Sequence, residues 1–423
     1  MSTGNPRYGQ INLISEVLSS PAYQERCDLL FELFCESRKT DKNPNSILEL
    51  QAAVIELLNH FQEKRSEFKR EKNELGVAVV NQLILNVKRI VDSVVWRLFN
   101  FDRVQIQLFS EHSKTGYLDN TIFNDFDIAQ QIVAQNGSIV IMNDLTTVLR
   151  HADLTLIRNN EISLLETKHG RASSKNRRAK RQRKRLDELI RFHNTGFRDR
   201  GIERDFIFKA DIPIKTYHAY VDEISNQARI HGYHKVMVSD CVAIEAINMR
   251  SRSVSLENKH PFDGIQHISK FHNLQLFGIT APRVAPYGIF PLTDKNSFEL
   301  MTGYMLLTTT INFDCLKEKY KHFSLALNLP EPNEQEIKTY ITSPISDRKK
   351  LMHQYKFTVS DEDYYNTLTA DLFGWIGLEF MHEDTFIQST KQLISFFKDL
   401  DIPPDDKNIR VYIGYKDETK IWI

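Results

Sequence analysis

The segment 152–168 constrains the fold of this 423-residue chain more than any other part of it. It holds two apolar runs that meet at Asn159 and Asn160. Asparagine tolerates the positive φ that a two-residue type I′ turn requires at both positions, so the segment predicts a tight β-hairpin. Residues at equal distances from such a turn pair across the hairpin. Arg158 then lies opposite Glu161, which is a favourable pair of opposite charges.

The same register places two carboxylates opposite each other. Asp153 pairs with Glu166, and the Cβ atoms of directly opposed residues lie ~4.5–5.5 Å apart, where like charges destabilise the pair. Lys168 follows Glu166 by two residues and therefore projects from the same face. The sequence predicts two carboxylates and an ammonium beyond an apolar stem. The alternative is an edge hairpin whose surface charges are balanced by Lys168.

A divalent cation would make this arrangement favourable. Carboxylates are hard oxygen ligands for Mg²⁺, which completes its coordination with waters and substrate phosphate. The metal can activate a water and stabilise charge on the phosphate under attack. We expect Asp153 and Glu166 to bind Mg²⁺, which Mn²⁺ can replace, with the backbone carbonyl of Thr167 as a third ligand. Asp153, Glu166 and Lys168 are the expected catalytic residues, and Lys168 would orient the water, accept its proton or hold the phosphate.

This arrangement resembles the PD-(D/E)XK nuclease superfamily, in which an aspartate is followed on the next strand by Glu-x-Lys. Asp153 and the tripeptide Glu-Thr-Lys at 166–168 match that pattern. The order of helix, three strands, helix and strand over about residues 120–215 also matches. The resemblance implies metal-dependent hydrolysis of phosphodiester bonds. Ala152 stands where members of the superfamily often have a proline.

The resemblance also implies a further acid on the helix that precedes the strands. That helix is predicted at residues 125–134. Asp127 is the first candidate for this additional metal ligand and Asp125 is the second, because the spacing does not decide between them.

A cationic run follows the hairpin, with nine Lys or Arg and no acid in residues 171–185. We expect a helix over 175–193, with Ser174 as N-cap and Gly196 as the stop. Apolar residues gather only in its second half, which can pack on the sheet while the first half stays in solvent. Lys and Arg bind nucleic-acid phosphates without reading sequence. The expected nucleic-acid-binding residues are Arg171, Lys175, Arg177, Arg178, Lys180, Arg181, Gln182, Lys184 and Arg185.

Two other interpretations of this run remain open, a nuclear-localisation signal and a solvated helix face. In the resembled fold this helix borders the active site, and Gln182 lies where members often place a polar residue near the metal.

These elements predict an α/β fold with three regions. Residues 116–248 would form a restriction-endonuclease-like core, a mixed sheet in αβββαβ order. Residues 1–115 would form a helical N-terminal region, with a capping box at 46–49 and a helix over 77–98. Residues 249–423 would form an α+β C-terminal region of unknown role. The elements expected there are helices over 361–380 and 384–400 and a terminal β-hairpin over 409–423.

Composition narrows the class of protein. The 55 basic and 55 acidic residues balance, which excludes a uniformly basic coat and makes any basic site local. The four cysteines contain no Cys-x-x-Cys pair, so free thiols in a reducing cytosol are favoured over a zinc site. No apolar run approaches the ~18 residues that would span a bilayer. We expect a cytoplasmic protein without membrane contact.

The hypothesis that follows is a metal-dependent nuclease, with DNA favoured over RNA and an endonuclease favoured over an exonuclease. By analogy, bacterial proteins that join such a core to other regions often act in restriction or anti-phage defence. A second hypothesis is a nucleic-acid-binding module with an inactive core. A third is an effector activated by a partner, in which the N-terminal helices bind that partner or another copy of the chain.

Overall fold

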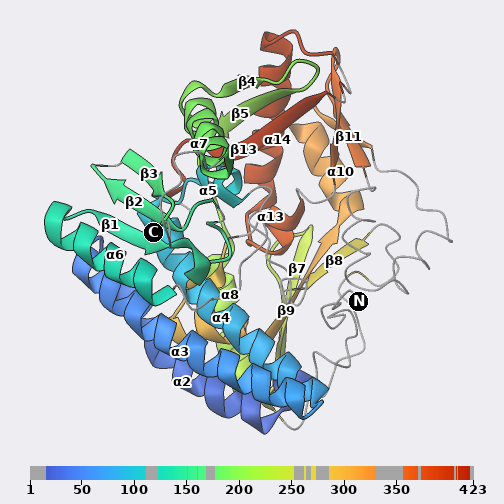
Figure 1. Ribbon diagram of the computed structural model, residues 1–423. Coiled ribbons are helices and arrows are strands. Elements are labelled where there is room, and N and C mark those ends of the chain that lie inside the picture. The colour runs from blue at the N-terminus through green and yellow to red at the C-terminus, as the bar shows by residue number, and fades with distance from the viewer. Residues whose placement is uncertain are drawn as a thin grey trace.

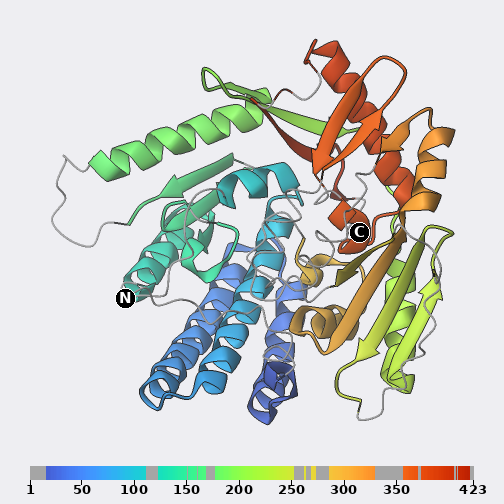
Figure 2. The same ribbon diagram turned by 90° about the vertical axis from the view of Figure 1, so that its right-hand side faces the viewer.

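Three long helices lie side by side along one side of the molecule (Figures 1 and 2). They are α2 (Pro21–Lys39), α3 (Pro44–Arg70) and α4 (Glu74–Leu98). The computed structural model describes residues 16–110, 122–149, 151–159, 161–167, 177–251, 262, 268–272, 285–328, 356–369, 373–403, 406 and 408–419. Within these ranges the protein is mixed α/β with a helical N-terminal region, as expected.

Helix α3 begins earlier than its sequence suggests. Asn43 Oδ1 accepts hydrogen bonds from the backbone N–H groups of Asn45 and Ser46, and Pro44 occupies the first turn. The predicted capping box at Ser46 is therefore wrong, because Asn43 caps the helix three residues earlier and a proline follows it at the first helical position. The predicted helix over 77–98 is confirmed as α4.

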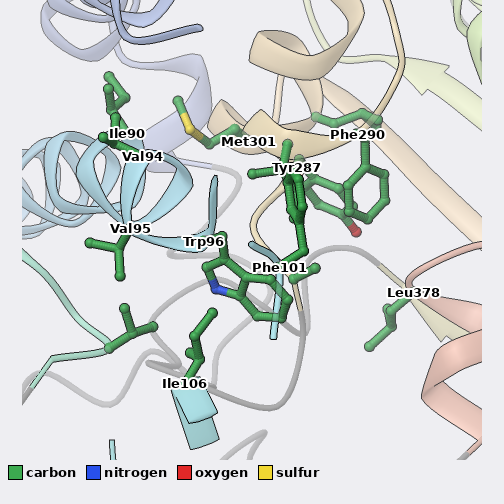
Figure 3. Close-up of a cluster of buried hydrophobic side chains, with 14 of the residues drawn as sticks. Ile90, Val94, Val95, Trp96, Phe101, Ile106, Tyr287, Phe290, Met301 and Leu378 are labelled. Carbon is green, nitrogen blue, oxygen red and sulfur yellow. The ribbon is translucent and has the colours of Figure 1, made fainter. Parts of the chain in front are cut away.

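Helix α4 is buried on most of its surface, which makes it the central helix of the N-terminal region. It packs on α2, on α3 and on η3 (Tyr287–Ile289). Figure 3 shows Trp96 of α4 beside Tyr287, with Met301 between Tyr287 and the α4 residues Ile90 and Val94. None of the helices in the described ranges has both the length and the apolar character that crossing a bilayer requires.

The predicted hairpin is present. β2 (Leu154–Arg158) pairs antiparallel with β3 (Glu161–Leu165), and Arg158 lies opposite Glu161. Asn159 adopts a φ of 50°, as a type I′ turn requires. β1 (Ile139–Met142) pairs with the other edge of β2, and the helices α3 and α6 (Ile122–Asn136) pack on β1 (Figure 1).

The next strands lie in a different sheet, of order β13-β5-β4. After α7 (Arg177–Thr195), β4 (Phe197–Asp199) forms a hairpin with β5 (Arg204–Ala210). β13 (Ile409–Tyr415) then pairs with β5 in parallel.

Two expectations are corrected by this topology. The order of helix, three strands, helix and strand is present, but β5 does not join the β1-β2-β3 sheet, so a restriction-endonuclease-like core is not confirmed. The segment from 409 is a single strand that completes the sheet of β5, not one arm of a terminal hairpin in the described ranges. Apolar periodicity identifies a strand but does not identify its partner, and this limit explains both differences.

A third sheet follows in the chain, of order β6-β7-β9-β8 and antiparallel throughout. Its strands are β6 (Tyr233–Met237), β7 (Val242–Asn248), β8 (Ile268–His272) and β9 (Met305–Asn312). It is accompanied by the helices α8 (His218–His231), α9 (Asp294–Thr302) and α10 (Phe313–His322).

Cys241 and Cys315 form a disulfide between the start of β7 and α10. The expectation of four free thiols is wrong for this pair, because a separation of 74 residues leaves no local spacing pattern. Cys27 and Cys35 are free, as expected.

The C-terminal part holds a small sheet and two further helices. The sheet consists of β10 (Ala326–Asn328), β11 (Lys356–Ser360) and β12 (Tyr365–Thr369). α14 (Glu383–Asp399) confirms the helix predicted over 384–400. The helix predicted over 361–380 is wrong, because β12 and the short α13 (Gly374–Gly377) lie there. Threonine and tyrosine in β12 favour a strand over a helix.

One hydrophobic cluster extends from Val17 to Tyr415. It crosses the region boundaries expected at 115 and 248. A buried ion pair crosses them as well. Arg103, at the start of α5 (Arg103–Ser110), is fully buried and donates to both carboxylate oxygens of Glu379, at 2.7 and 2.6 Å.

The surroundings of Arg103 explain how a buried charge is tolerated. The guanidinium carbon lies 5.3 Å from the ring centroid of Trp96 and 5.4 Å from that of Trp375. Glu418 is buried beside it, and its Oε2 accepts from the backbone N–H of Arg103 at 3.3 Å. Burial lowers the pKa of Arg103, but the charges of Glu379 and Glu418 outweigh this effect and raise it above the usual value. Burial raises the pKa of Glu418 to about 7.

Arg103→Ala should lower the free energy of unfolding by ~3–5 kcal/mol, because it leaves the carboxylate of Glu379 buried without its cation. The matched control is Arg204→Ala, which removes a more exposed ion pair with Asp406 and should cost ~0–1 kcal/mol. Urea unfolding followed by circular dichroism measures both. Equal costs for the two variants would contradict this account of the buried pair.

Candidate functional site

The regular part of the hairpin ends one residue short of the two predicted carboxylates. Leu154 and Leu165 are the last paired residues. Ala152 adopts a φ of 63°, and the N–H of Asp153 donates to the carbonyl of Leu165 at 3.2 Å. Asp153 is thereby drawn out of the regular ladder, and the face-to-face pairing of Asp153 with Glu166 is not formed.

The Asp153 carboxylate instead meets Thr167. Its Oδ2 accepts from the backbone N–H of Thr167 at 2.7 Å and lies 2.9 Å from the Thr167 hydroxyl. The same hydroxyl also contacts Oδ1 of Asp125, which α6 supplies. Two carboxylates from different elements therefore converge on one threonine side chain. Glu166 directly precedes Thr167 in the sequence and is half-buried.

Helix geometry decides which acid of α6 faces this site. Asp125 is 6% exposed and reaches Thr167, whereas Asp127 is exposed. Residues two apart on a helix point in directions about 200° apart, so both cannot face the hairpin. The second candidate, Asp125, is the acid that the structure brings to the cluster.

The hydroxyl of Thr167 is the functional group that the sequence analysis overlooked. For Thr167 the sequence predicts only a backbone-carbonyl ligand, although its hydroxyl lies between the Glu and the Lys of the motif and is an available signal. Asn143, which contacts the backbone of Asp153, carried no sequence signal. Lys168, Arg171 and Lys175 lie outside the described residues.

The two carboxylates that meet at Thr167 have the chemistry of metal ligands. A threonine hydroxyl carries one hydrogen, so it can donate to only one of the two carboxylates it contacts. Carboxylates this close repel each other unless a proton or a cation lies nearby. The carboxylates of Asp125 and Asp153 are hard oxygen ligands of the kind that Mg²⁺ and Mn²⁺ prefer. Among the described residues, the carboxylate oxygens of Asp125, Asp153 and Glu166 do not all lie within 4.8 Å of one another, so the structure does not bring Glu166 to this pair.

The second half of α7 packs as expected. Leu189 and Phe192 are buried in a small cluster with Val104, Leu108 and Tyr412. Figures 1 and 2 show α7 on the same side of the molecule as the β2–β3 hairpin. Gly196, with a φ of 72°, ends the helix, and its N–H donates to the carbonyl of Phe192.

An ion-pair group anchors the C-terminal end of α7. Asp102 Oδ2 lies 3.0 Å from His193 Nε2 and 2.8 Å from Lys209 Nζ. Burial opposes ionisation of Asp102, but the hydrogen bond from His193 and the charge of Lys209 hold its pKa well below the usual range.

The first half of α7 carries the cationic run. The helix is formed over Arg177, Arg178, Lys180, Arg181, Gln182 and Arg185, whose side chains lie outside the described part of the structure. In this half, the structure describes the side chain of Lys184, which is 81% exposed. Its Nζ lies 3.7 Å from Oε1 of Glu188. An exposed cation here is compatible with a phosphate-binding surface.

A second acidic group lies at the start of α14. One potential ligand atom each from His382, Glu383 and Asp384 lies within 4.8 Å of the others. His382 Nδ1 accepts from the backbone N–H of Asp384 as the N-cap, and Glu383 pairs with Lys319 at 2.6 Å. Lys319 already supplies a positive charge there, so this group serves to start a helix.

The chain matches no protein-family profile, no curated protein and no solved structure.

Ala152→Pro should lower the free energy of unfolding by more than about 1 kcal/mol, because proline cannot adopt the φ of 63° found here. Ala152→Gly is the paired control and should change stability by no more than about 1 kcal/mol, since glycine adopts positive φ freely. Chemical denaturation measures both. A proline variant as stable as the glycine variant would show that residue 152 does not require this conformation.

Proposed function

We propose that this protein is a metal-dependent nuclease that hydrolyses phosphodiester bonds, with DNA as the favoured substrate. Asp153, Glu166 and Lys168 are the proposed catalytic residues, and Asp125 is a further metal ligand. The observation that carries the proposal is the convergence of Asp125 and Asp153 on Thr167. The motif lysine follows Thr167 directly in the sequence, and the cationic run begins three residues later.

The chemistry needs charge stabilisation near a phosphate and an activated water. A bound Mg²⁺ or Mn²⁺ lowers the pKa of a coordinated water and stabilises charge on the phosphate. Asp125, Asp153 and Glu166 would hold that cation. Lys168 would orient the attacking water or hold the phosphate. We further propose, by analogy alone, a role in defence against foreign DNA.

The cationic run would hold the substrate rather than act on it. Lys and Arg bind the phosphate backbone of any sequence and position it. Because α7 and the hairpin lie on the same side of the molecule, a backbone bound along the first half of α7 would approach the carboxylate cluster (Figure 2).

Asp153→Asn and Glu166→Gln should each lower cleavage by at least about 100-fold, and Asp125→Asn should lower it less. Each removes a charge that the cation requires, so higher Mn²⁺ should restore part of the activity of Asp125→Asn. Cleavage of plasmid, linear and single-stranded DNA and of RNA with Mg²⁺ or Mn²⁺ measures this. Asp127→Asn is the matched control, because it removes an equal charge from the exposed face of the same helix.

Unchanged cleavage in Glu166→Gln and Lys168→Ala would refute this assignment of the catalytic residues. A protein that binds nucleic acid but never cleaves it, with either metal, would instead support a binding module with an inactive core.

Arg178→Glu with Arg181→Glu should weaken DNA binding and reduce the slope of log affinity against log salt by about two, given ~0.9 per lost phosphate contact. Fluorescence anisotropy across a salt series measures both quantities. Lys69→Glu with Arg70→Glu is the control, because it makes the same change in net charge at the exposed end of α3. If both double variants lose affinity equally, net charge rather than α7 governs binding.

A further inference from the structure

Asn143 connects the backbone around Asp153. It is 3% exposed, and its Nδ2 donates to the carbonyls of His151 and Ala152, at 2.5 and 3.3 Å. Its Oδ1 accepts from the Thr155 hydroxyl at 2.7 Å, and its backbone N–H donates to the carbonyl of Asp153 at 2.9 Å. One residue therefore holds the backbone carbonyls of three consecutive residues that end at the candidate metal ligand.

These bonds hold a conformation that alanine does not favour. The φ of 63° at Ala152 lies in the left-handed region, which residues with a Cβ rarely adopt. Without the Asn143 amide, Ala152 could relax to a negative φ. Asp153 follows it directly, so this change would turn the Asp153 carboxylate away from Thr167.

Asn143 is itself held firmly. It begins the short helix η1 (Asn143–Leu145), and its carbonyl accepts hydrogen bonds from the N–H and the hydroxyl of Thr146, both at 3.0 Å. The next residue, Thr147, donates to Asp92 of α4 through its N–H and its hydroxyl, at 2.7 and 2.5 Å. The path from α4 to Asp153 is thus continuous and buried.

We propose that Asn143 is a positioning residue, which holds the Asp153 carboxylate in the orientation that captures the divalent cation. This inference rests on the proposed function. Removal of partners that orient a metal ligand typically costs ~10–100-fold in metal affinity. A purely structural asparagine would affect stability and leave the affinity of the folded protein unchanged.

Gln51 provides the matched control. It is also a buried amide, 1% exposed, and it bonds to the same sheet. Its Nε2 donates to the carbonyl of Val140 at 2.8 Å, and its Oε1 accepts from the N–H of Met142 at 2.7 Å. Gln51→Ala removes comparable hydrogen bonds from β1 without touching the backbone of Asp153.

The experiment measures Mn²⁺ binding to the full chain by isothermal titration calorimetry, at a temperature where circular dichroism shows each variant folded. Asn143→Ala should bind Mn²⁺ ~10–100-fold more weakly than the unchanged protein. Gln51→Ala should bind it as the unchanged protein does. If Asn143→Ala does not fold, Thr155→Val decides the question, because it keeps the side-chain shape and removes the bond to Asn143 Oδ1; it should also weaken binding.

A second substitution separates positioning from general loosening. The double variant Asn143→Ala with Ala152→Gly has a glycine at 152, which adopts positive φ without steric cost. Residue 152 can then keep its conformation without the Asn143 amide. Part of the lost Mn²⁺ affinity should therefore return. A structural role alone predicts no such recovery, since it predicts no loss.

The outcomes distinguish the two proposals. If the unchanged protein binds Mn²⁺ and folded Asn143→Ala binds it equally well, the positioning role is refuted and the nuclease proposal stands. If the unchanged protein binds no Mn²⁺, the metal-dependent function fails and the positioning role fails with it.

Discussion

The ion pair between the buried Arg103 guanidinium and Glu379 is the interaction on which the arrangement of the chain depends. A cation with no exposed surface must be neutralised where it lies, and its partner Glu379 comes from a segment 276 residues away. Trp96 and Trp375 enclose it, and Glu418 joins it from beyond β13. The N-terminal helices and the C-terminal segment must therefore meet correctly before this charge is stable. The same contact holds α5 in place, and α5 in turn packs on α7.

The sequence predicts local features of this protein well. The hairpin register follows from Asn159 and Asn160, because a tight turn leaves one way to pair the flanking residues. The positions of α4 and α14 follow from apolar periodicity, and the end of α7 follows from Gly196. The end of the hairpin could not be predicted, because it depends on the buried amide of Asn143 and on the hydroxyl of Thr167. The choice between Asp125 and Asp127 likewise depends on which face of α6 meets the sheet.

Contacts between residues far apart in the sequence could not be predicted, for a different reason. The pairing of β5 with β13 and the disulfide between Cys241 and Cys315 each join segments that leave no trace in local pattern. An isolated strand signal fits any sheet with an open edge. For that reason the order of elements resembled one known fold while the sheets were assembled differently.

The parallel pairing of β13 with β5 has a consequence for how this protein is made. The residues from 204 to 210 have a hairpin neighbour on one side as soon as they are synthesised, but the other edge stays open until the ribosome has released residues 409–415. An open strand edge is a surface on which chains aggregate. Native pairing across such a span is also slow to form. Aggregation during synthesis is therefore a hazard that this pairing of distant strands creates.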